Sequence, residues 1–320
     1  MMKLSVAAAA LLAVLGVGSA HADDYPSRPI RMLLPFSAGG GGDTLGRILA
    51  ERFAVELKQP VIVENKPGAG GTIGIAAVAR SAPDGYTITI GGMTTHILSP
   101  SVYKDLQYDP IKSFTSLGAI GNSAIMIVAN NDFPANDLEQ LKKLAATRKD
   151  PVQYASWGIG STGHFCGEVL VQKGNLKMQH VPYKGTTQIM TDIMGGHVDI
   201  GFVDMATATP LVTQKKVKGI AVCTKRSPSV PDIQSYKEQG IDFDRDLNWA
   251  MYVPAGTPKP IVERLSGTLE KVLKEQEVAT KLLGLGITAQ YVSGSAHEKA
   301  NVADIEAWRT VARDAGIKPQ

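Results

Sequence analysis

Short apolar runs alternate with amphipathic stretches along most of the chain. In the clearest amphipathic stretch, Leu45, Leu49 and Phe53 recur at helical spacing, while charged residues occupy the opposite face. We predict strands at Ile30–Pro35, Val61–Glu64, Tyr86–Gly91, Ser116–Ile120, Ala124–Asn130, Val152–Ser156, Val198–Val203, Gly219–Thr224 and Asn248–Val253. We predict helices at Thr44–Leu57, Thr72–Arg80, Asp137–Thr147, Thr162–Gly174, Thr186–Gly195, Lys259–Lys274, Glu277–Leu283 and Ala296–Ala315. This alternation is typical of an α/β protein with largely parallel sheets.

Two polar or glycine-rich segments interrupt this pattern and separate a middle block from the two ends of the chain. Gly118–Ser123 breaks an apolar run with flexible residues, and Lys225–Asp246 is polar and carries two prolines. A chain that passes twice between two α/β units predicts a hinged, two-lobe architecture. We expect residues 23–121 and 227–320 to form lobe 1 and residues 122–226 to form lobe 2.

We predict that the first 22 residues are an export signal and do not belong to the fold. Lys3 supplies a positive start, Leu4–Gly18 is uncharged and apolar, and Ala20-His21-Ala22 is a small-x-small cleavage pattern. The apolar stretch is shorter than the roughly 20 residues that span a bilayer. We therefore predict an exported protein, cleaved after Ala22.

The amino-acid composition argues against several classes of protein. The chain of 320 residues is 44% hydrophobic, which fits a globular protein, and its formal charge of +3 is too small to predict nucleic-acid binding. Its two cysteines, Cys166 and Cys223, exclude a disulfide-rich scaffold and a four-thiolate zinc site. In an oxidising compartment they could pair, but their spacing matches no disulfide motif, and two buried thiols fit the sequence equally well.

A strand–glycine loop–helix motif occurs twice and is the most informative feature. The first loop, Phe36–Thr44, follows the first predicted strand, and the second, Trp157–His164, follows the strand at 152–156. Glycine permits backbone geometries in which successive N–H groups converge, and a helix start adds unpaired donors. Both loops therefore favour anion binding. We assign Asp43 to capping the first helix, which would leave the donors of Ser37–Gly40 free for a ligand.

The sequence does not support a nucleotide-binding, catalytic or metal-binding motif. Gly158-x-Gly160-x-x-Gly163 matches a dinucleotide fingerprint, but no acidic residue for the ribose follows about 20 residues later. No P-loop and no Gly-x-Ser-x-Gly are present. His164 and Cys166 are two apart and point in different directions on one helix, so His164 is interpreted as a capping or packing residue. The remaining histidines lack metal-ligand spacing, and we predict no catalytic residue, no metal and no cofactor.

In these segments the chain resembles the periplasmic solute-binding proteins of tripartite tricarboxylate transporters, the Bug (Bordetella uptake gene) family. The resemblance covers essentially all of the chain after residue 22. The matching segments are Tyr25–Arg31, Pro35–Gly40, Asp43–Thr44, Val63–Gly71, Ala82–Thr87, Tyr154–His164, His180–Gly185, Gly195–Asp199 and Val253–Pro260.

The resemblance implies a type II periplasmic binding protein, in which two α/β lobes close like a flytrap over a small carboxylate. By the same resemblance the ligand-binding residues would be Phe36, Ser37, Ala38, Gly39, Gly40, Thr94, Thr95, Trp157, Gly158, Ser161, Thr162, Gly163 and Asp204. Trp157 replaces a small residue, and the run of four glycines ending at Gly42 is also unusual. Trp157 could stack on an aromatic acid, reduce the size of the cavity, or pack beneath the loop.

Three functions remain in competition. The favoured one is a periplasmic binding protein that delivers a carboxylate to membrane permease subunits, acts as a monomer and uses backbone N–H groups, Ser37, Ser161 and Thr162 as donors. A sensory ligand-binding module would share the same pocket. A secreted hydrolase with Ser161 as nucleophile would need a histidine base, for which His180 is the nearby candidate.

Overall fold

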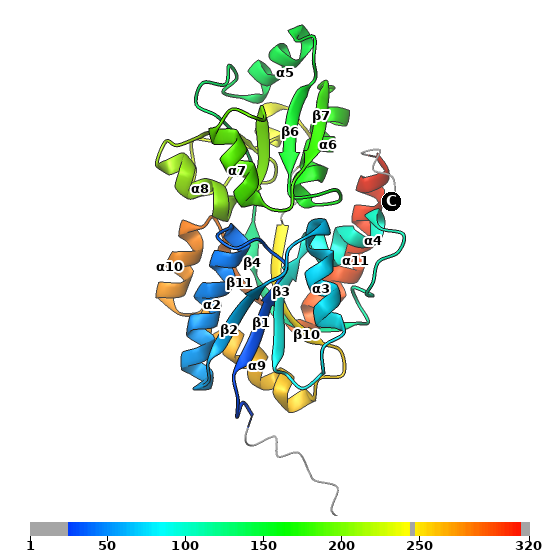
Figure 1. Ribbon diagram of the computed structural model, residues 1–320, viewed down its shortest axis with the longest axis vertical. Coiled ribbons are helices and arrows are strands. Elements are labelled where there is room, and N and C mark those ends of the chain that lie inside the picture. The colour runs from blue at the N-terminus through cyan, green and yellow to red at the C-terminus, as the bar shows by residue number, and fades with distance from the viewer. Residues whose placement is uncertain (1–24, 244–246, 315–320) are drawn as a thin grey trace, which may run out of the picture.

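The computed structural model describes residues 25–243 and 247–314, so the predicted signal sequence lies outside the described residues. Figure 1 shows two lobes, one above the other, each built around a sheet. We call them the six-strand lobe and the five-strand lobe. The first has the strand order β11-β4-β10-β3-β1-β2 and the second β7-β6-β8-β5-β9. The two-lobe α/β fold expected from the sequence is confirmed.

The strand bounds locate each sheet in the sequence. The six-strand lobe contains β1 (Ile30–Leu34), β2 (Val61–Asn65), β3 (Thr87–Gly92), β4 (Phe114–Ser123), β10 (Leu247–Pro254) and β11 (Thr288–Ser293). The five-strand lobe contains β5 (Ile125–Ala129), β6 (Val152–Ser156), β7 (Met178–Pro182), β8 (Ile200–Asp204) and β9 (Lys218–Val222). Strand β1 runs parallel to β2 and β3, and β6 runs parallel to β7 and β8, whereas β10 and β5 are antiparallel to their neighbours.

Helices cover both sheets. They are α2 (Gly41–Leu57), α3 (Thr72–Ala79), α4 (Ser99–Val102), α5 (Leu138–Thr147), α6 (Thr162–Lys173), α7 (Thr186–Met194), α8 (Met205–Thr213), α9 (Lys259–Leu273), α10 (Gln276–Gly284) and α11 (Gly294–Asp314). A π-helical segment, η3 (Met93–Leu98), and two short 3-10 segments, η2 (Ala69–Gly71) and η4 (Lys237–Gln239), complete the described elements. No helix in these described stretches combines the length and apolarity needed to cross a membrane.

The chain passes between the lobes at two places, directly after β4 and between β9 and β10. The segment Gly118–Ser123, predicted to connect the two units, does lead into the first crossing, but its residues belong to strand β4 and are not a flexible linker. The glycines in this part of β4 allow the neighbouring strand to approach closely. A Cβ on Gly121 would lie 2.2 Å from the carbonyl oxygen of Thr288 on β11, and Gly121 has a φ of +157°. Only glycine allows this close approach of the two strands.

Several elements differ from the sequence prediction. Strands β7 and β11, helix α8 and the η3–α4 segment were not predicted. The two strands are half-exposed and lie at sheet edges, so their hydrophobic pattern is weak. Helix α2 begins at Gly41 and not at Thr44, because the glycines at its start adopt helical geometry without a side-chain cap.

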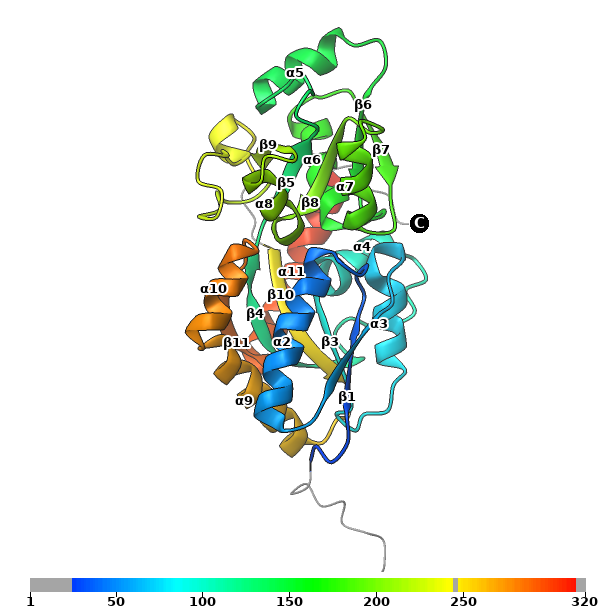
Figure 2. The ribbon, with the colours of Figure 1, turned by 60° about the vertical axis from the view of Figure 1, so that its left-hand side comes forward.

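Helix α11 contacts both lobes. It packs against β4 and η3 of the six-strand lobe. At its other end, the ring of Trp308 meets Phe165 of α6 edge-on at a centroid distance of 5.9 Å and Phe243 at 5.8 Å. These buried rings belong to the same apolar cluster as the core of the five-strand lobe. Figure 2 shows α11 behind the junction of the lobes. The C-terminal helix therefore links the two lobes in addition to the two chain crossings.

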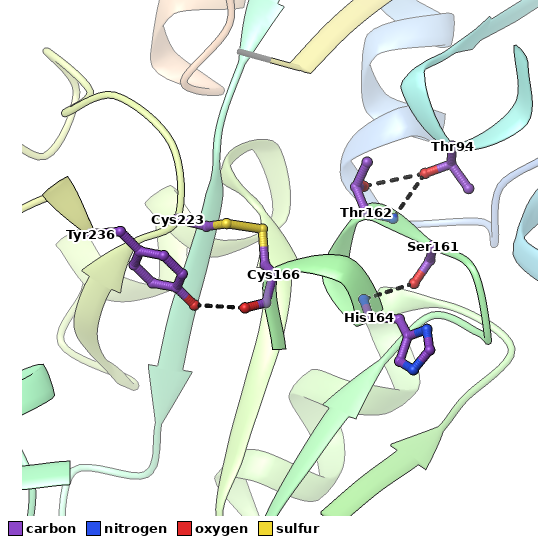
Figure 3. Close-up of a disulfide and its surroundings, with 7 residues drawn as sticks. All are labelled: Thr94, Ser161, Thr162, His164, Cys166, Cys223 and Tyr236. Carbon is purple, nitrogen blue, oxygen red and sulfur yellow. Dashed lines mark hydrogen bonds between the residues drawn. A yellow bond between two sulfur atoms is a disulfide. The ribbon is translucent and has the colours of Figure 1, made fainter. Parts of the chain in front are cut away.

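Cys166 and Cys223 form a disulfide, which settles the alternative left open by the sequence. The bond joins α6 to the residue that follows β9, within the five-strand lobe. The hydroxyl of Tyr236 donates a hydrogen bond to the carbonyl oxygen of Cys166 (3.1 Å), as Figure 3 shows. The helix that follows the second glycine loop is thus tied covalently to the end of β9.

Replacing both cysteines, as Cys166→Ala/Cys223→Ala, is expected to lower the free energy of unfolding by about 2–4 kcal/mol, because the bond closes a long loop in the unfolded chain. The sequence separation of the two cysteines is 57 residues. Urea unfolding at pH 7 measures the effect, with the chemically reduced wild-type chain as the matched control. Equal urea midpoints for the variant and the oxidised wild-type chain would contradict the expectation.

Candidate functional site

A cavity lies between the two lobes and holds about 760 Å³ of space free of protein atoms, its open mouth included. It is bounded by loops and helix starts that follow strands of both sheets, where open α/β folds bind ligands. Its lining residues are Pro35, Phe36, Ser37, Gly40, Gly42, Gly70, Gly71, Gly91, Gly92, Met93, Thr94, Thr95, Ser123, Ala124, Ile125, Trp157, Thr162, Lys184, Gly185, Thr186, Asp204, Leu247, Asn248 and Trp249. Of these, only Lys184 and Asp204 have ionisable side chains.

The first glycine loop is held in place by the buried carboxylate of Asp43. This carboxylate accepts hydrogen bonds from the Gly39 N–H (2.9 Å), Arg47 Nε (3.0 Å) and Asn65 Nδ2 (2.9 Å). Burial acts to raise the pKa of Asp43, but these hydrogen bonds outweigh it and hold the pKa below its usual value. Asp43 lies in the first turn of α2 and does not cap the helix, so the assignment of that role was wrong.

Hydrogen bonds within the protein occupy some of the backbone N–H groups of the first loop that were expected to bind a ligand. The Gly39 N–H is taken by Asp43, and the Gly40 N–H donates to the carbonyl oxygen of Ser37 (3.2 Å). The expectation that all donors from Ser37 to Gly40 would be free is therefore wrong. Ser37 and Phe36 still line the cavity, and the Phe36 ring packs edge-on against Trp249 with a centroid distance of 5.3 Å.

The second glycine loop is also held largely by its own side chains. Ser161 caps α6, accepting from the His164 N–H (3.2 Å), and its hydroxyl donates to Ser156 Oγ (3.2 Å). The Gly160 N–H donates to His164 Nδ1 (3.1 Å). Figure 3 shows the Ser161 cap, with the His164 ring directed away from Thr94. Ser161 is fully buried and is not among the lining residues.

Thr162 and Thr94 join the two lobes at the edge of the cavity. The Thr162 N–H donates to Thr94 Oγ1 (3.2 Å), and the two hydroxyls lie 3.2 Å apart (Figure 3). Nearby, the Tyr103 hydroxyl donates to the carbonyl oxygen of Ile159 (2.9 Å). Thr95, next to Thr94, also lines the cavity, and its Oγ1 accepts from the Gly92 N–H (3.2 Å).

A second set of contacts between the lobes joins the starts of α2 and α8. The Gly41 N–H of α2 donates to Thr207 Oγ1 of α8 (2.8 Å). Asp204 caps α8 by accepting from the Thr207 N–H (2.9 Å). A Cβ on Gly41 would lie 2.1 Å from Asp204 Oδ1 and 2.4 Å from the Ala206 Cβ. The lobes are therefore in direct contact on both sides of the cavity, and glycine at position 41 makes the contact with α8 possible.

Trp157 packs beneath the second glycine loop and also lies at the cavity wall. Its side chain lines the cavity and also packs against the apolar clusters of the five-strand lobe. A Cβ on Gly163 would lie 2.7 Å from Trp157 Cζ3, so the ring lies directly against the first turn of α6. Packing over Gly163 fixes the ring, and its remaining surface forms part of the cavity wall.

The residues expected from the sequence divide into two groups. Those that line the cavity are Phe36, Ser37, Gly40, Thr94, Thr95, Trp157, Thr162 and Asp204. Those in the same loops that are not among the lining residues are Ala38, Gly39, Gly158, Ser161 and Gly163. Ala38 nonetheless contributes to the contact between the lobes, because its carbonyl oxygen accepts from Thr187 Oγ1 (3.3 Å).

Besides Pro35 and Gly42, which lie next to expected residues of the first loop, sequence reasoning missed five parts of the wall. They are Gly70–Gly71, Lys184–Thr186, Leu247–Trp249, Gly91–Met93 and Ser123–Ile125. The first two lie in glycine-containing segments that lead into helices α3 and α7. The pattern that identified the two loops, a glycine-rich segment followed by a helix, could therefore have predicted them. Residues 247–249 form the start of strand β10 and carry no comparable signal.

The histidines near the second loop are not arranged for nucleophilic catalysis. His180 Nε2 bonds to Ser156 Oγ (2.7 Å), so Ser156 stands between His180 and Ser161. Burial lowers the pKa of His164 to about 4, and burial together with the neighbouring His164 lowers that of His180 to about 3. Both rings are therefore neutral at pH 7. Within the described stretches, no group of acidic, histidine or cysteine residues could hold a metal ion.

Comparison with known proteins gives consistent matches over both lobes. A family model described as "Tripartite tricarboxylate transporter family receptor" matches residues 45–316. The periplasmic binding protein BugD is 35% identical with a TM-score of 0.88, covering 92% of this chain and 100% of that one. R. palustris Rpa4515 with adipate is 28% identical with a TM-score of 0.89 (93% and 100%). MatC from Rhodopseudomonas palustris with bound malate is 29% identical with a TM-score of 0.84 (90% and 99%).

The Gly41→Ala substitution is expected to hold the lobes apart. The new methyl group would overlap Asp204 and Ala206, and overpacking of this kind costs about 1–3 kcal/mol in the closed form. Small-angle X-ray scattering should then give a larger radius of gyration than for the wild-type protein. Gly267→Ala in α9 is the matched control, since a Cβ there meets nothing within 4 Å. Identical scattering from both variants would contradict the assigned role of Gly41.

Proposed function

Since this chain belongs to the tripartite tricarboxylate transporter receptor family, we propose that it is a periplasmic solute-binding protein that captures a small carboxylate by closing its two lobes around it. The family consists of solute receptors and not of enzymes. The main support for the proposal is the cavity between the lobes, because hydroxyl groups and helix starts of both lobes border it.

The polar groups of the cavity suit a carboxylate. Ser37, Thr94 and Thr162 line it, and the starts of α2 and α7 border it at Gly42 and Thr186. Hydroxyls and the N–H groups of a helix start are donors that stabilise an anion. Hydrogen bonds to a charged group contribute about 1.5–3 kcal/mol each, so a few of them give useful affinity without an arginine. The related proteins solved with adipate and malate bind ligands of this class.

The same proposal includes the cellular setting. We propose that residues 1–22 direct export and that the mature protein acts as a monomer, with lobe 1 formed by residues 23–121 and 227–320 and lobe 2 by residues 122–226. Membrane permease subunits of a tripartite uptake system would receive the ligand. The family assignment and the similarity to periplasmic binding proteins support this setting.

Isothermal titration calorimetry of the mature protein against linear mono- and dicarboxylates and aromatic acids tests the proposal. At least one acid should bind with one-to-one stoichiometry, because each molecule has one such cavity between its lobes in the described residues. The acid should also be recovered unchanged after incubation. Absence of binding across the whole panel, or conversion of the acid, would contradict the proposal.

A further inference from the structure

The second glycine loop carries two of the hydrogen bonds that join the lobes. Before the tip of the loop, the carbonyl oxygen of Ile159 accepts from the Tyr103 hydroxyl of the six-strand lobe (2.9 Å). After the tip, the Thr162 N–H donates to Thr94 Oγ1 of the same lobe (3.2 Å), as Figure 3 shows. The lobes can therefore keep this contact only while the loop holds both backbone groups in place.

Between these two bonds, the backbone of Gly160 is fixed by the side chain of His164. Gly160 has a φ of +75°, and a Cβ there would lie 2.5 Å from Val102 Cγ1, so the tip of the loop lies against the six-strand lobe. The Gly160 N–H donates to His164 Nδ1 (3.1 Å). An imidazole nitrogen accepts a hydrogen bond only when it carries no proton, so this contact requires a neutral ring with its hydrogen on Nε2.

The surroundings of His164 oppose a charge on its ring. The side chain is buried, and the ring of His180 from β7 stacks on it with a centroid distance of 4.2 Å. Glu168 Oε1 of α6 lies 3.8 Å from His164 Nε2, too far for a hydrogen bond, and accepts instead from the Tyr154 hydroxyl of β6 (2.5 Å). Burial outweighs the attraction of this carboxylate and lowers the pKa of His164 to about 4.

We propose that His164 is a positioning residue that holds the second glycine loop in its closed arrangement only while the ring is uncharged, so that closure of the lobes weakens in mild acid. This role is separate from ligand contact, because His164 is not among the residues that line the cavity. A proton on Nδ1 would point at the Gly160 N–H, so the bond between them would break. The tip of the loop then loses its fixed position against the six-strand lobe.

The direction of the pH effect follows from proton binding. A ring released with the loop returns toward its ordinary pKa of 6.5, whereas in the closed loop the pKa is about 4. The closed loop is therefore fully favoured above pH 6.5 and becomes less favoured as the pH falls toward 4. The equilibrium shifts toward the released loop by up to about tenfold per pH unit within this window.

Amide hydrogen exchange of the mature protein, followed by NMR without any added ligand, tests this role directly. After correction for the intrinsic effect of pH on exchange, the amides of Gly160 and Thr162 should exchange about tenfold or more faster at pH 5 than at pH 7. The nitrogen shifts of the His164 ring should show hydrogen on Nε2 at pH 7. Equal corrected rates at both pH values, or hydrogen on Nδ1, would overturn the proposal.

The variant His164→Asn separates the charge of the ring from its function as an acceptor. The amide oxygen of asparagine takes the place of Nδ1 and can accept from the Gly160 N–H at either pH, because it does not titrate. Slow exchange at pH 7 should be retained and the acid effect lost. His197→Asn, the same change at an exposed histidine of the five-strand lobe, is the matched control and should keep the wild-type pH profile. An acid effect that persists in His164→Asn would place the titrating group elsewhere and refute the proposal.

The variant His164→Leu removes the acceptor altogether. The amides of Gly160 and Thr162 should then exchange at pH 7 at least as fast as they do in the wild-type protein at pH 5. Slow exchange of both amides in this variant would contradict the positioning role, and if the variant does not fold, the wild-type pH profile and His164→Asn decide. Calorimetry at pH 7 in which no acid binds would contradict the proposed function alone, because the exchange measurements use no ligand.

Discussion

The close approach of the two lobes depends on backbone positions that carry no side chain. At Gly41, the start of α2 meets Asp204 and Ala206 so closely that a single methyl group would overlap both. At Gly185, an added Cβ would lie 1.9 Å from Ser37 Oγ, across the same boundary. These glycines let helix starts from different sheets border one cavity. The hydrogen bond from Gly41 to Thr207 and the pair formed by Thr94 and Thr162 then hold the arrangement from both sides.

The glycine loops are held in place mainly by hydrogen bonds with side chains of the same loops and of the helices that follow them. Asp43 fixes the first loop through Gly39, and Ser161 and His164 fix the second through the start of α6. Such internal bonds make the cavity walls rigid before a ligand arrives, which lowers the entropy cost of binding. The groups left to face the ligand are chiefly hydroxyls, the starts of neighbouring helices and Asp204. Selectivity can therefore come from a few side chains on a preorganised frame.

Much of the fold could be predicted from the sequence, because strands such as β1 and β8 are wholly or largely buried and α2 shows a clear helical period. Edge strands β7 and β11 could not, since their alternation is weak. Eight of the residues expected in the site line the cavity between the lobes. The inward turn of Ser161 and the approach of Gly41 to Asp204 depend on contacts between residues far apart in the chain, about which local periodicity carries no information.

A crystal structure of the mature protein with its tightest-binding acid tests the central claim most directly. The account predicts electron density for one intact acid in the cavity between the lobes, with a carboxylate within hydrogen-bonding distance of Ser37, Thr94 or Thr162. It further predicts that α2 and α8 remain in contact at Gly41. An acid bound elsewhere on the surface, or a cavity that stays free of ligand under saturating conditions, would contradict it.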